Sequence, residues 1–245
     1  MRALSSVVAF DEDHHVHSTF SDDAVSTLEQ NIDAARERGL RAICLADHVR
    51  VDSAWVPSFL SAVNGLRPVR GLTLLAGVEA KILDVSGRLD LPGSLIGVDR
   101  VLIADHQFPA DLGPVHPAKM RVALATGSRR PAEVIACLVE ATVNAMQAAP
   151  HPQLAHLFSV LPKMGLDEAD IPGTALSHLA RRASRAGAQV EVNEKWACPS
   201  ARTLRAFIEA GVPVMASTDS HDCTTIGRYT RVRQIADDAC ALAVS

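Results

Sequence analysis

The sequence predicts an α/β protein built on a mainly parallel sheet. Short apolar runs alternate along the chain with longer segments whose apolar residues recur at helical spacing, a pattern typical of strands joined by crossover helices. The chain has 245 residues, 48% of them hydrophobic and 21% charged, which is enough to bury one core. Because no repeat, low-complexity tract or long linker interrupts it, a single domain over residues 1–245 is expected.

The first helix is expected to begin near Ser26. Ser26 and Glu29 have the spacing of a capping box, Ile32 and Ala35 share one helical face, and Gly39 provides a stop signal. Similar periodicity predicts further helices at about residues 54–66, 131–148, 173–186 and 200–210. The stretch 109–130 contains three prolines and is expected to be an ordered excursion from the same domain.

Seven strands are expected between these helices, at residues 13–17, 41–46, 74–80, 100–104, 154–156, 189–193 and 212–217. Nearly every strand ends in, or runs into, a residue that can bind a metal ion. The carboxyl ends of the strands of a parallel barrel gather on one face. Side chains spread from residue 13 to residue 221 can therefore meet in one pocket.

The first strand carries two histidines on one face. Strand periodicity places Asp13, His15 and His17 on the same side, and two imidazoles on one face can hold one metal ion. In the third strand, Glu79 lies inside an apolar run. A buried, unpaired glutamate is costly, so a cation is expected beside it; the alternative is a salt bridge to Lys81 or to an arginine.

The same combination of His and carboxylate recurs at the other strand ends, at Asp47 and His48, Asp105 and His106, His156, Glu191, and Asp219 and His221. Asp22 and Asp23 follow the first strand. Their carboxylates could reach over the mouth of the pocket; the alternative is that they belong to an ordinary polar turn. Six of the 10 histidines occupy these positions. The repetition predicts a site for more than one metal ion.

These residues resemble the motifs of the polymerase and histidinol phosphatase (PHP) family. The matching segments, in order, are His15-Val16-His17 with Ser21-Asp22, Ala46-Asp47-His48, Gly77-Val78-Glu79, Asp105-His106, Ala155-His156 and Ser217-Thr218-Asp219-Ser220-His221. The resemblance implies a distorted seven-stranded (β/α)7 TIM-like barrel with a centre of two or three divalent metal ions. One departure is that Leu157 follows His156, where many members have proline.

The resemblance also implies a ligand set in three groups: His15, His17, Glu79 and Asp219 for one ion, Glu79, His106 and His156 for a second, and Asp22, His48 and His221 for a third. Asp23 is an alternative to Asp22. Imidazole and carboxylate ligands without cysteine suit Zn²⁺, Mn²⁺ or Fe²⁺. Glu79 would bridge the first two ions.

The expected function is hydrolysis of a small phosphomonoester, such as histidinol phosphate or a nucleotide monophosphate. The nucleophile would be a hydroxide held between metal ions, with Glu79, Asp219 and His221 as the catalytic residues and Asp219 or His221 as the acid for the leaving group. A metal-dependent hydrolase of carbon-nitrogen bonds is an alternative. So is a non-catalytic module of the polymerase type.

Four basic residues follow or lie near these motifs and are expected to bind the substrate phosphate: Arg50, Lys81, Lys195 and Arg228. Taken singly, each is also compatible with a solvated surface charge. Glycine-rich nucleotide loops and the GxSxG nucleophile motif do not occur in the sequence.

Composition narrows the expected partners. The net charge of −4 argues against general nucleic-acid binding, which requires a basic excess. No apolar stretch is long enough to serve as a signal peptide or a membrane span. Five cysteines without a CxxC pair suit a reducing compartment, and most of them are expected to be buried. A cytoplasmic location follows from these features; the oligomeric state stays open.

Overall fold

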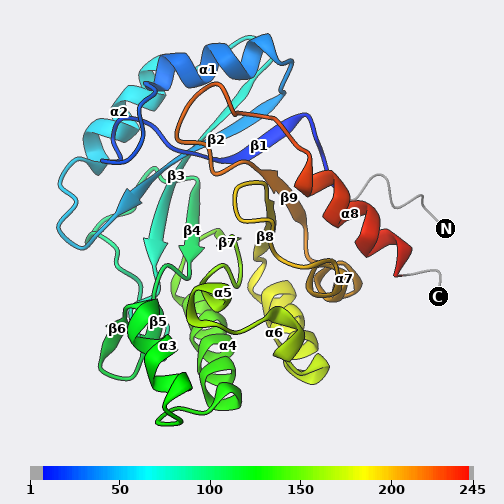
Figure 1. Cartoon of the computed structure of the whole chain (residues 1–245). Coiled ribbons are helices and arrows are strands. Elements are labelled where there is room, and N and C mark those ends of the chain that lie inside the picture. The colour runs from blue at the N-terminus through cyan, green and yellow to red at the C-terminus, as the bar shows by residue number, and fades with distance from the viewer. Residues whose placement is uncertain (1–7, 243–245) are drawn as a thin grey trace.

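The computed structural model describes residues 8–242. Seven parallel strands form one sheet in the order β1-β2-β3-β4-β7-β8-β9. Their bounds are β1 Glu12–Val16, β2 Ala42–Val49, β3 Thr73–Lys81, β4 Arg100–Ala104, β7 Pro152–Ala155, β8 Gln189–Asn193 and β9 Val214–Ser217. A single bridge between Val16 and Ser220 links the two outermost strands, and the backbone N–H of His17 donates to the Ser220 carbonyl at 2.8 Å. The sheet therefore nearly closes, which confirms the predicted seven-stranded barrel (Figure 1).

Helices surround this sheet (Figure 1). They are α1 Leu28–Glu37, α2 Val56–Leu66, α3 Pro117–Ala125, α4 Pro131–Ala148, α5 Val160–Met164, α6 Gly173–Ala186, α7 Ala201–Glu209 and α8 Arg231–Ala241, with a short 3₁₀ turn, η2, at Glu168–Asp170. The large core cluster lies between strands and helices and includes Leu138 and Phe207. Residues 1–7 and 243–245 of the predicted single domain lie outside the described part, so the domain extent stays a prediction.

Small side chains fill the middle of the sheet. Cys44, Ala46, Ala104 and Ala155 pack with Leu102 in a separate buried cluster. A Cβ atom at Gly77 would come within 2.9 Å of the Cys44 Sγ. These small residues leave the space at the carboxyl ends of the strands for larger polar side chains.

The predicted capping box at Ser26 is wrong. Thr27 is the N-cap of α1, and its partner in the capping box is Gln30. The Ser26 hydroxyl instead accepts the backbone N–H of Cys223 at 2.8 Å, which ties the start of α1 to the loop after β9. The predicted end of this helix is confirmed, since Gly39 follows it with φ of 68°.

The excursion over residues 109–130 is ordered, as expected. It contains a short antiparallel hairpin, β5 Phe108–Ala110 and β6 Gly113–Val115, followed by α3. Pro117 is at the first position of α3, and the His116 side chain caps it by accepting the Ala118 N–H at 3.2 Å. This segment brings His116 to the mouth of the barrel.

Two expectations drawn from composition can be compared with the structure. Cys44 and Cys198 are buried, but Cys137, Cys223 and Cys240 are partly exposed, so the expectation that most thiols are buried is wrong.

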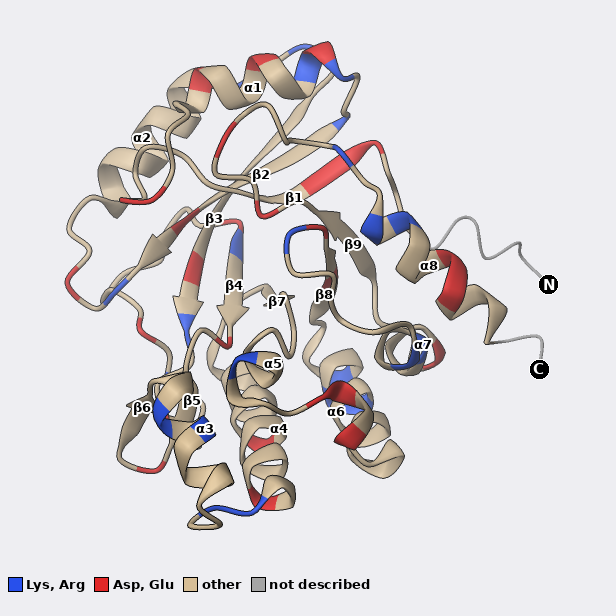
Figure 2. Cartoon of the chain, viewed as in Figure 1, with Lys and Arg blue, Asp and Glu red and all other residues tan. Residues whose placement is uncertain are grey.

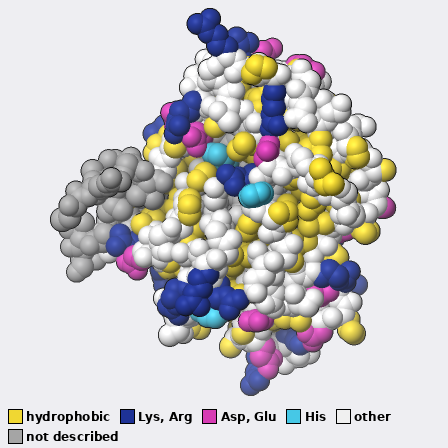
Figure 3. Space-filling view, turned by 180° about the vertical axis from the view of Figure 1, so that it is seen from behind, with side chains coloured by type: hydrophobic (Ala, Val, Ile, Leu, Met, Phe, Trp, Pro, Cys, Tyr) yellow, Lys and Arg dark blue, Asp and Glu magenta, His cyan; other side chains and the backbone are white. Residues whose placement is uncertain are grey.

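Within residues 8–242, no helix has the length and apolarity needed to cross a membrane. On the face opposite to that of Figure 1, basic side chains lie in separate groups with acidic ones between them (Figure 3). The absence of general nucleic-acid binding stays a prediction.

Candidate metal centre and its cleft

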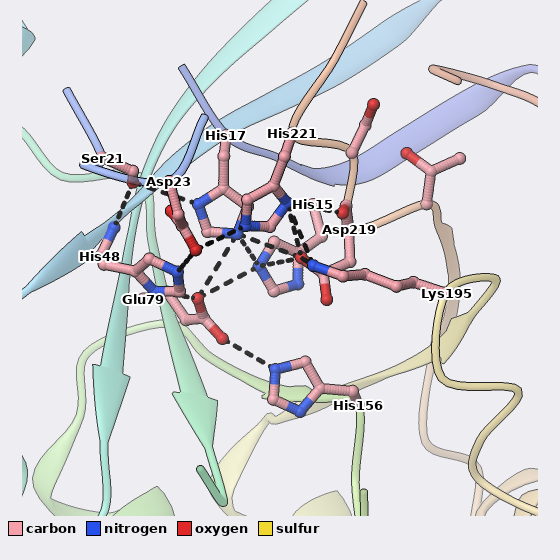
Figure 4. A network of polar contacts seen from close by, with 12 residues as sticks. His15, His17, Ser21, Asp23, His48, Glu79, His156, Lys195, Asp219 and His221 are labelled. Carbon is pink, nitrogen blue, oxygen red and sulfur yellow. Dashed lines mark hydrogen bonds and ion pairs between the residues drawn. The ribbon is translucent and has the colours of Figure 1, made fainter. Parts of the chain in front are cut away.

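Two histidines at the carboxyl end of β1, His15 and His17, form the first part of the site. His15 and His17 point to the same side of the strand end, with 3.0 Å between their Nε2 atoms (Figure 4). The Nδ1 atom of His15 lies 3.1 Å from a Glu191 carboxylate oxygen. Because a carboxylate only accepts, this Nδ1 carries a proton, and the Nε2 atom is the one that faces the cluster. Burial lowers the pKa of His17 to about 3, so this imidazole is neutral, the form that binds a metal ion.

Glu79 stands at the centre of the cluster and is 1% exposed. Imidazole nitrogens surround both of its carboxylate oxygens. The distances are 2.8 Å to His156 and 3.0 Å to His106 from Oε1, and 2.7 Å to His48 and 3.5 Å to both His15 and His17 from Oε2. Lys81 lies 3.8 Å from Asp90 and forms no salt bridge with Glu79 among the described residues.

The charges around Glu79 call for a cation. Its Oε2 atom is buried and makes no hydrogen bond among the described residues, although three imidazoles surround it. Burial alone would raise the pKa of Glu79, but His106 and His15 hold it well below its usual value. Burial opposes protonation of His156 as well, yet the carboxylates of Asp105, 3.6 Å away, and of Glu79 raise its pKa to about 10. The cluster therefore attracts positive charge, as protons or as metal ions.

A third group lies nearer to solvent. The Oδ2 atom of Asp23 is 3.1 Å from the Nε2 of His221 and 3.4 Å from the Nε2 of His48. Asp22 lines the same cleft, but its carboxylate contacts neither histidine and has no ion pair among the described residues. Of the two alternatives drawn from the sequence, the geometry brings Asp23 to this group.

Asp219 faces the β1 histidines from the end of β9. Its Oδ1 atom is 3.2 Å from the Nε2 of His17 and 3.6 Å from the Nζ of Lys195, while its Oδ2 accepts the Trp196 indole N–H at 2.7 Å. Burial opposes ionisation, but the charge of His15 and the hydrogen bond with His17 lower the pKa of Asp219. Asp219 has a φ of 53°, a strained conformation for a non-glycine residue, of the kind that gathers at functional sites.

Glu191 lies behind the candidate metal ligands and orients them, a role that was not evident from its position in the sequence. It is fully buried and accepts hydrogen bonds from four groups: the His15 ring, the Gln153 amide at 3.0 Å, the His156 backbone N–H at 2.6 Å and the Asn193 amide at 2.8 Å. Groups that hold the outer nitrogen of a ligating histidine fix its tautomer and its orientation. The signal in the sequence is the same as for Glu79, an acid inside an apolar strand.

Asp47 and Asp105 also lie behind histidines, each acting through a serine. The Ser21 hydroxyl donates to Asp47 at 2.7 Å and lies 3.3 Å from the Nδ1 of His17. The Ser159 hydroxyl donates to Asp105 at 2.8 Å and lies 3.1 Å from the Nδ1 of His156. Ser21 was part of a matched motif but had no role assigned to it, and Ser159 was not singled out, because only the tertiary structure brings each serine to its histidine.

The residues present fit metal ions. Three sets of ligand atoms each lie within 4.8 Å of one another: His15, His17 and Glu79; His48, Glu79 and His106; and His17, His48 and His221. Imidazole nitrogens and carboxylate oxygens without cysteine form a donor set that borderline divalent metals accept. The sets overlap, because His17, His48 and Glu79 each belong to two of them; of these three, only the carboxylate of Glu79 has two oxygens with which it could serve two ions.

A cleft of about 670 Å³ opens over this cluster. Arg50, Lys81 and Lys195 line it, as do two residues that the sequence did not single out, His116 and Lys163. Arg228 instead lines an adjoining cavity of about 490 Å³, which Lys195, Asp219 and His221 also border. Three of the four basic residues expected at the substrate therefore share the main cleft, and the fourth lies beside it.

A parallel α/β barrel with a histidine-carboxylate cluster at the carboxyl ends of its strands defines a class of metal-binding barrel proteins. The family model of the PHP domain matches residues 13–151, which is more than half of the 245 residues. The chain therefore belongs to the PHP domain family.

Curated relatives bear the name probable phosphatase. One from Enterobacter sp. strain 638 is 25% identical over 240 residues, covering 92% of this chain and 84% of the relative. Another, from Photobacterium profundum, is 35% identical over 99 residues, covering 39% of this chain and 40% of the relative.

A similar solved structure is the histidinol phosphate phosphatase of Lactococcus lactis, in complex with zinc, L-histidinol and phosphate. It has a TM-score of 0.65 and 17% sequence identity, and the match covers 93% of each chain. At this identity the likeness shows that the two proteins share a fold.

Proposed function

We propose that this protein is a metal-dependent phosphatase that hydrolyses a small phosphomonoester. The observation that carries the proposal is the buried carboxylate of Glu79, with five imidazole nitrogens within 3.5 Å of its oxygens, in a cleft that Arg50, Lys81 and Lys195 also line. Bound divalent ions would activate a water molecule and neutralise the charge that develops on the phosphoryl oxygens. The names of the curated relatives support the same reaction class.

The side chains of the cleft have distinct tasks in this proposal. Glu79 keeps its two groups of histidines at a fixed separation. Lys195 lies 3.6 Å from Asp219 and 3.2 Å from the His221 ring, where its ammonium would bind a phosphate oxygen. Arg50 and Lys81, which also line the cleft, would bind the same dianion or guide it inward. Arg228, in the adjoining cavity, would add to the positive electrostatic potential that attracts the phosphate.

Asp219 is the proposed proton carrier. Its Oδ1 atom lies 3.2 Å from the Nε2 of His17 and faces the cluster, where it would accept a proton from the attacking water and pass it to the leaving oxygen. The Trp196 N–H holds one of its oxygens, and the other faces the cluster. His221 contacts both Lys195 and Asp23, and it is the second residue placed to exchange a proton with the leaving group.

The substrate is proposed to be small. A cleft of about 670 Å³ is in the range of sites for metabolite-sized ligands. The aromatic content of 4% gives few platforms on which a run of nucleotide bases could stack. The L-histidinol and phosphate bound by the structural neighbour are of this size.

The test is product release by metal-reconstituted protein on a panel of histidinol phosphate, glycerol 3-phosphate and adenosine monophosphate. We expect inorganic phosphate to appear, to stop on addition of a chelator and to resume with Zn²⁺ or Mn²⁺. Release of ammonia from amide or amine substrates, with no phosphate released from any ester, would instead support the carbon-nitrogen hydrolase. Failure to turn over any substrate of either kind would favour the non-catalytic module.

A further inference from the structure

Lys163 is a cation in the cleft that the proposed reaction does not use. It lies on α5, the short helix that follows β7 and His156, and it lines the cleft. Its Nζ atom is 3.8 Å from the centroid of the Trp196 ring. Among residues 8–242 no carboxylate oxygen lies within 4.0 Å of this ammonium, whereas Lys81 and Lys195 each have an acidic neighbour.

The ammonium of Lys163 is therefore partly desolvated without a counter-ion. Burial lowers the pKa of Lys163, against the opposing charges of Asp105 and Asp219. Contact with an indole face offsets only part of the cost of desolvation, because a cation-π contact at a partly exposed site is worth about 0.5–2 kcal/mol. An anion that enters the cleft would supply the missing partner.

The platform under Lys163 is fixed at both ends. The Trp196 backbone N–H donates to the Asn193 side-chain oxygen at 3.0 Å, and its indole N–H donates to Asp219 at 2.7 Å. Asp219 thus holds the edge of the ring, while Lys163 lies over its face. Lys195 is on the side of the metal cluster, 3.6 Å from Asp219 and 5.8 Å from the Trp196 centroid. The two lysines accordingly mark two different positions along the cleft.

The rest of the outer lining is also more positive than negative. When the candidate metal ligands Asp23, Glu79 and Asp219 are left out, the charged residues of the lining are Arg50, Lys81, Lys163 and Lys195 against Asp22 and Asp90. Asp90 is engaged by Lys81 and by the backbone N–H of Val51. Figure 2 shows basic segments at the end of β3, on α5 and in the loop after β8, around the mouth of the barrel.

We propose that Lys163, seated on Trp196, forms a second anion subsite, which binds a carboxylate or second phosphate on the organic part of the substrate. This inference rests on the proposed phosphatase function and names its substrate class: a small phosphomonoester with an additional negative charge. A leaving group that carries an ammonium would meet repulsion at the same place. The subsite therefore selects against cationic esters.

The test compares kcat/KM for four small esters that differ in the charge of the organic part. They are 3-phosphoglycerate with a carboxylate, propane-1,3-diol bisphosphate with a second phosphate, glycerol 3-phosphate with no further charge, and phosphoethanolamine with an ammonium. For the wild-type protein we expect at least one anionic ester to exceed glycerol 3-phosphate by about tenfold or more, as a charge-assisted contact allows. Phosphoethanolamine should be the poorest substrate.

The Lys163→Met variant keeps the length of the side chain and removes its charge. It should lose the preference for anionic esters while its kcat/KM for glycerol 3-phosphate stays within about twofold. Lys119→Met, at an exposed lysine on α3, is the matched control and should change nothing. Equal rates for neutral and anionic esters in the wild type, or an equal loss on all four esters in Lys163→Met, would overturn the subsite.

A binding measurement separates this proposal from the proposed function. Calorimetric titration of 3-phosphoglycerate and of glycerol 3-phosphate into the metal-loaded protein needs no turnover. Affinity for 3-phosphoglycerate that falls about tenfold in Lys163→Met, with glycerol 3-phosphate unaffected, supports the subsite even if no ester is hydrolysed. In that case only the phosphatase proposal fails. Equal affinities in the two proteins would overturn the subsite.

Discussion

The Glu79→Gln variant should lose at least about a hundredfold of the phosphate-releasing activity while remaining folded, since even residues that only support metal ligands typically cost ten- to a hundredfold. The substitution keeps the shape of the side chain but removes its charge. One carboxylate oxygen becomes an amide N–H₂ group, which has no lone pair to give to a metal ion. Glutamine therefore cannot bridge two ions held by the histidines around it. The measurement is kcat with saturating metal, accompanied by circular dichroism and the midpoint of urea unfolding.

The matched control for this variant is Glu37→Gln, at an exposed glutamate of α1. It makes the same chemical change away from the cleft and should leave activity and stability unaltered. Activity of Glu79→Gln above about a tenth of wild type, in a protein that binds its metals normally, would refute the bridging role of Glu79.

The Glu191→Gln variant should bind metal ions much more weakly than the wild type. Burial would raise the pKa of Glu191, but the nearby charge of His15 lowers it below its usual value. The side chain is therefore an ionised carboxylate that accepts hydrogen bonds from four donors. A glutamine there must turn an N–H₂ group toward at least one of these donors, which weakens the hold on the His15 ring or on the His156 backbone. We expect metal affinity to fall by about ten- to a hundredfold.

A titration with Zn²⁺ against a competing chelator measures this loss. Excess metal should restore much of the activity of Glu191→Gln but not of Glu79→Gln, because only Glu79 is placed among the ligand atoms. The same Glu37→Gln control applies. If Glu191→Gln bound Zn²⁺ as tightly as the wild type, the orienting role of Glu191 would be wrong.

The regular elements of the barrel were predictable from local pattern. The helices over residues 131–148 and 173–186 agree with α4 and α6 residue for residue, because long amphipathic segments with clear start and stop signals leave little ambiguity. The helices α3, α5 and α8 were not predicted: α5 has only five residues, and Thr230 precedes α8 without a side-chain capping bond. The shift of the cap from Ser26 to Thr27 arises from a tertiary contact, since Ser26 is used by the Cys223 backbone.

The approach of the candidate ligands to one another was also predictable, because strand-end residues of a parallel barrel gather on one face. Their supporting residues were not. Ser21 was noted only as part of a motif and Ser159 not at all, since their contacts with His17 and His156 depend on the folded chain. Lys163 was missed for the same reason, because its neighbour Trp196 comes from a different part of the barrel.

The most direct measurement of the central claim is the metal content of the purified protein. After reconstitution with Zn²⁺ or Mn²⁺ and removal of unbound ions by gel filtration, elemental analysis should find two or three equivalents per chain. This number follows from the three overlapping groups of ligand atoms around Glu79 and His17. A content below one equivalent, in protein whose circular dichroism shows a folded barrel, would contradict the account.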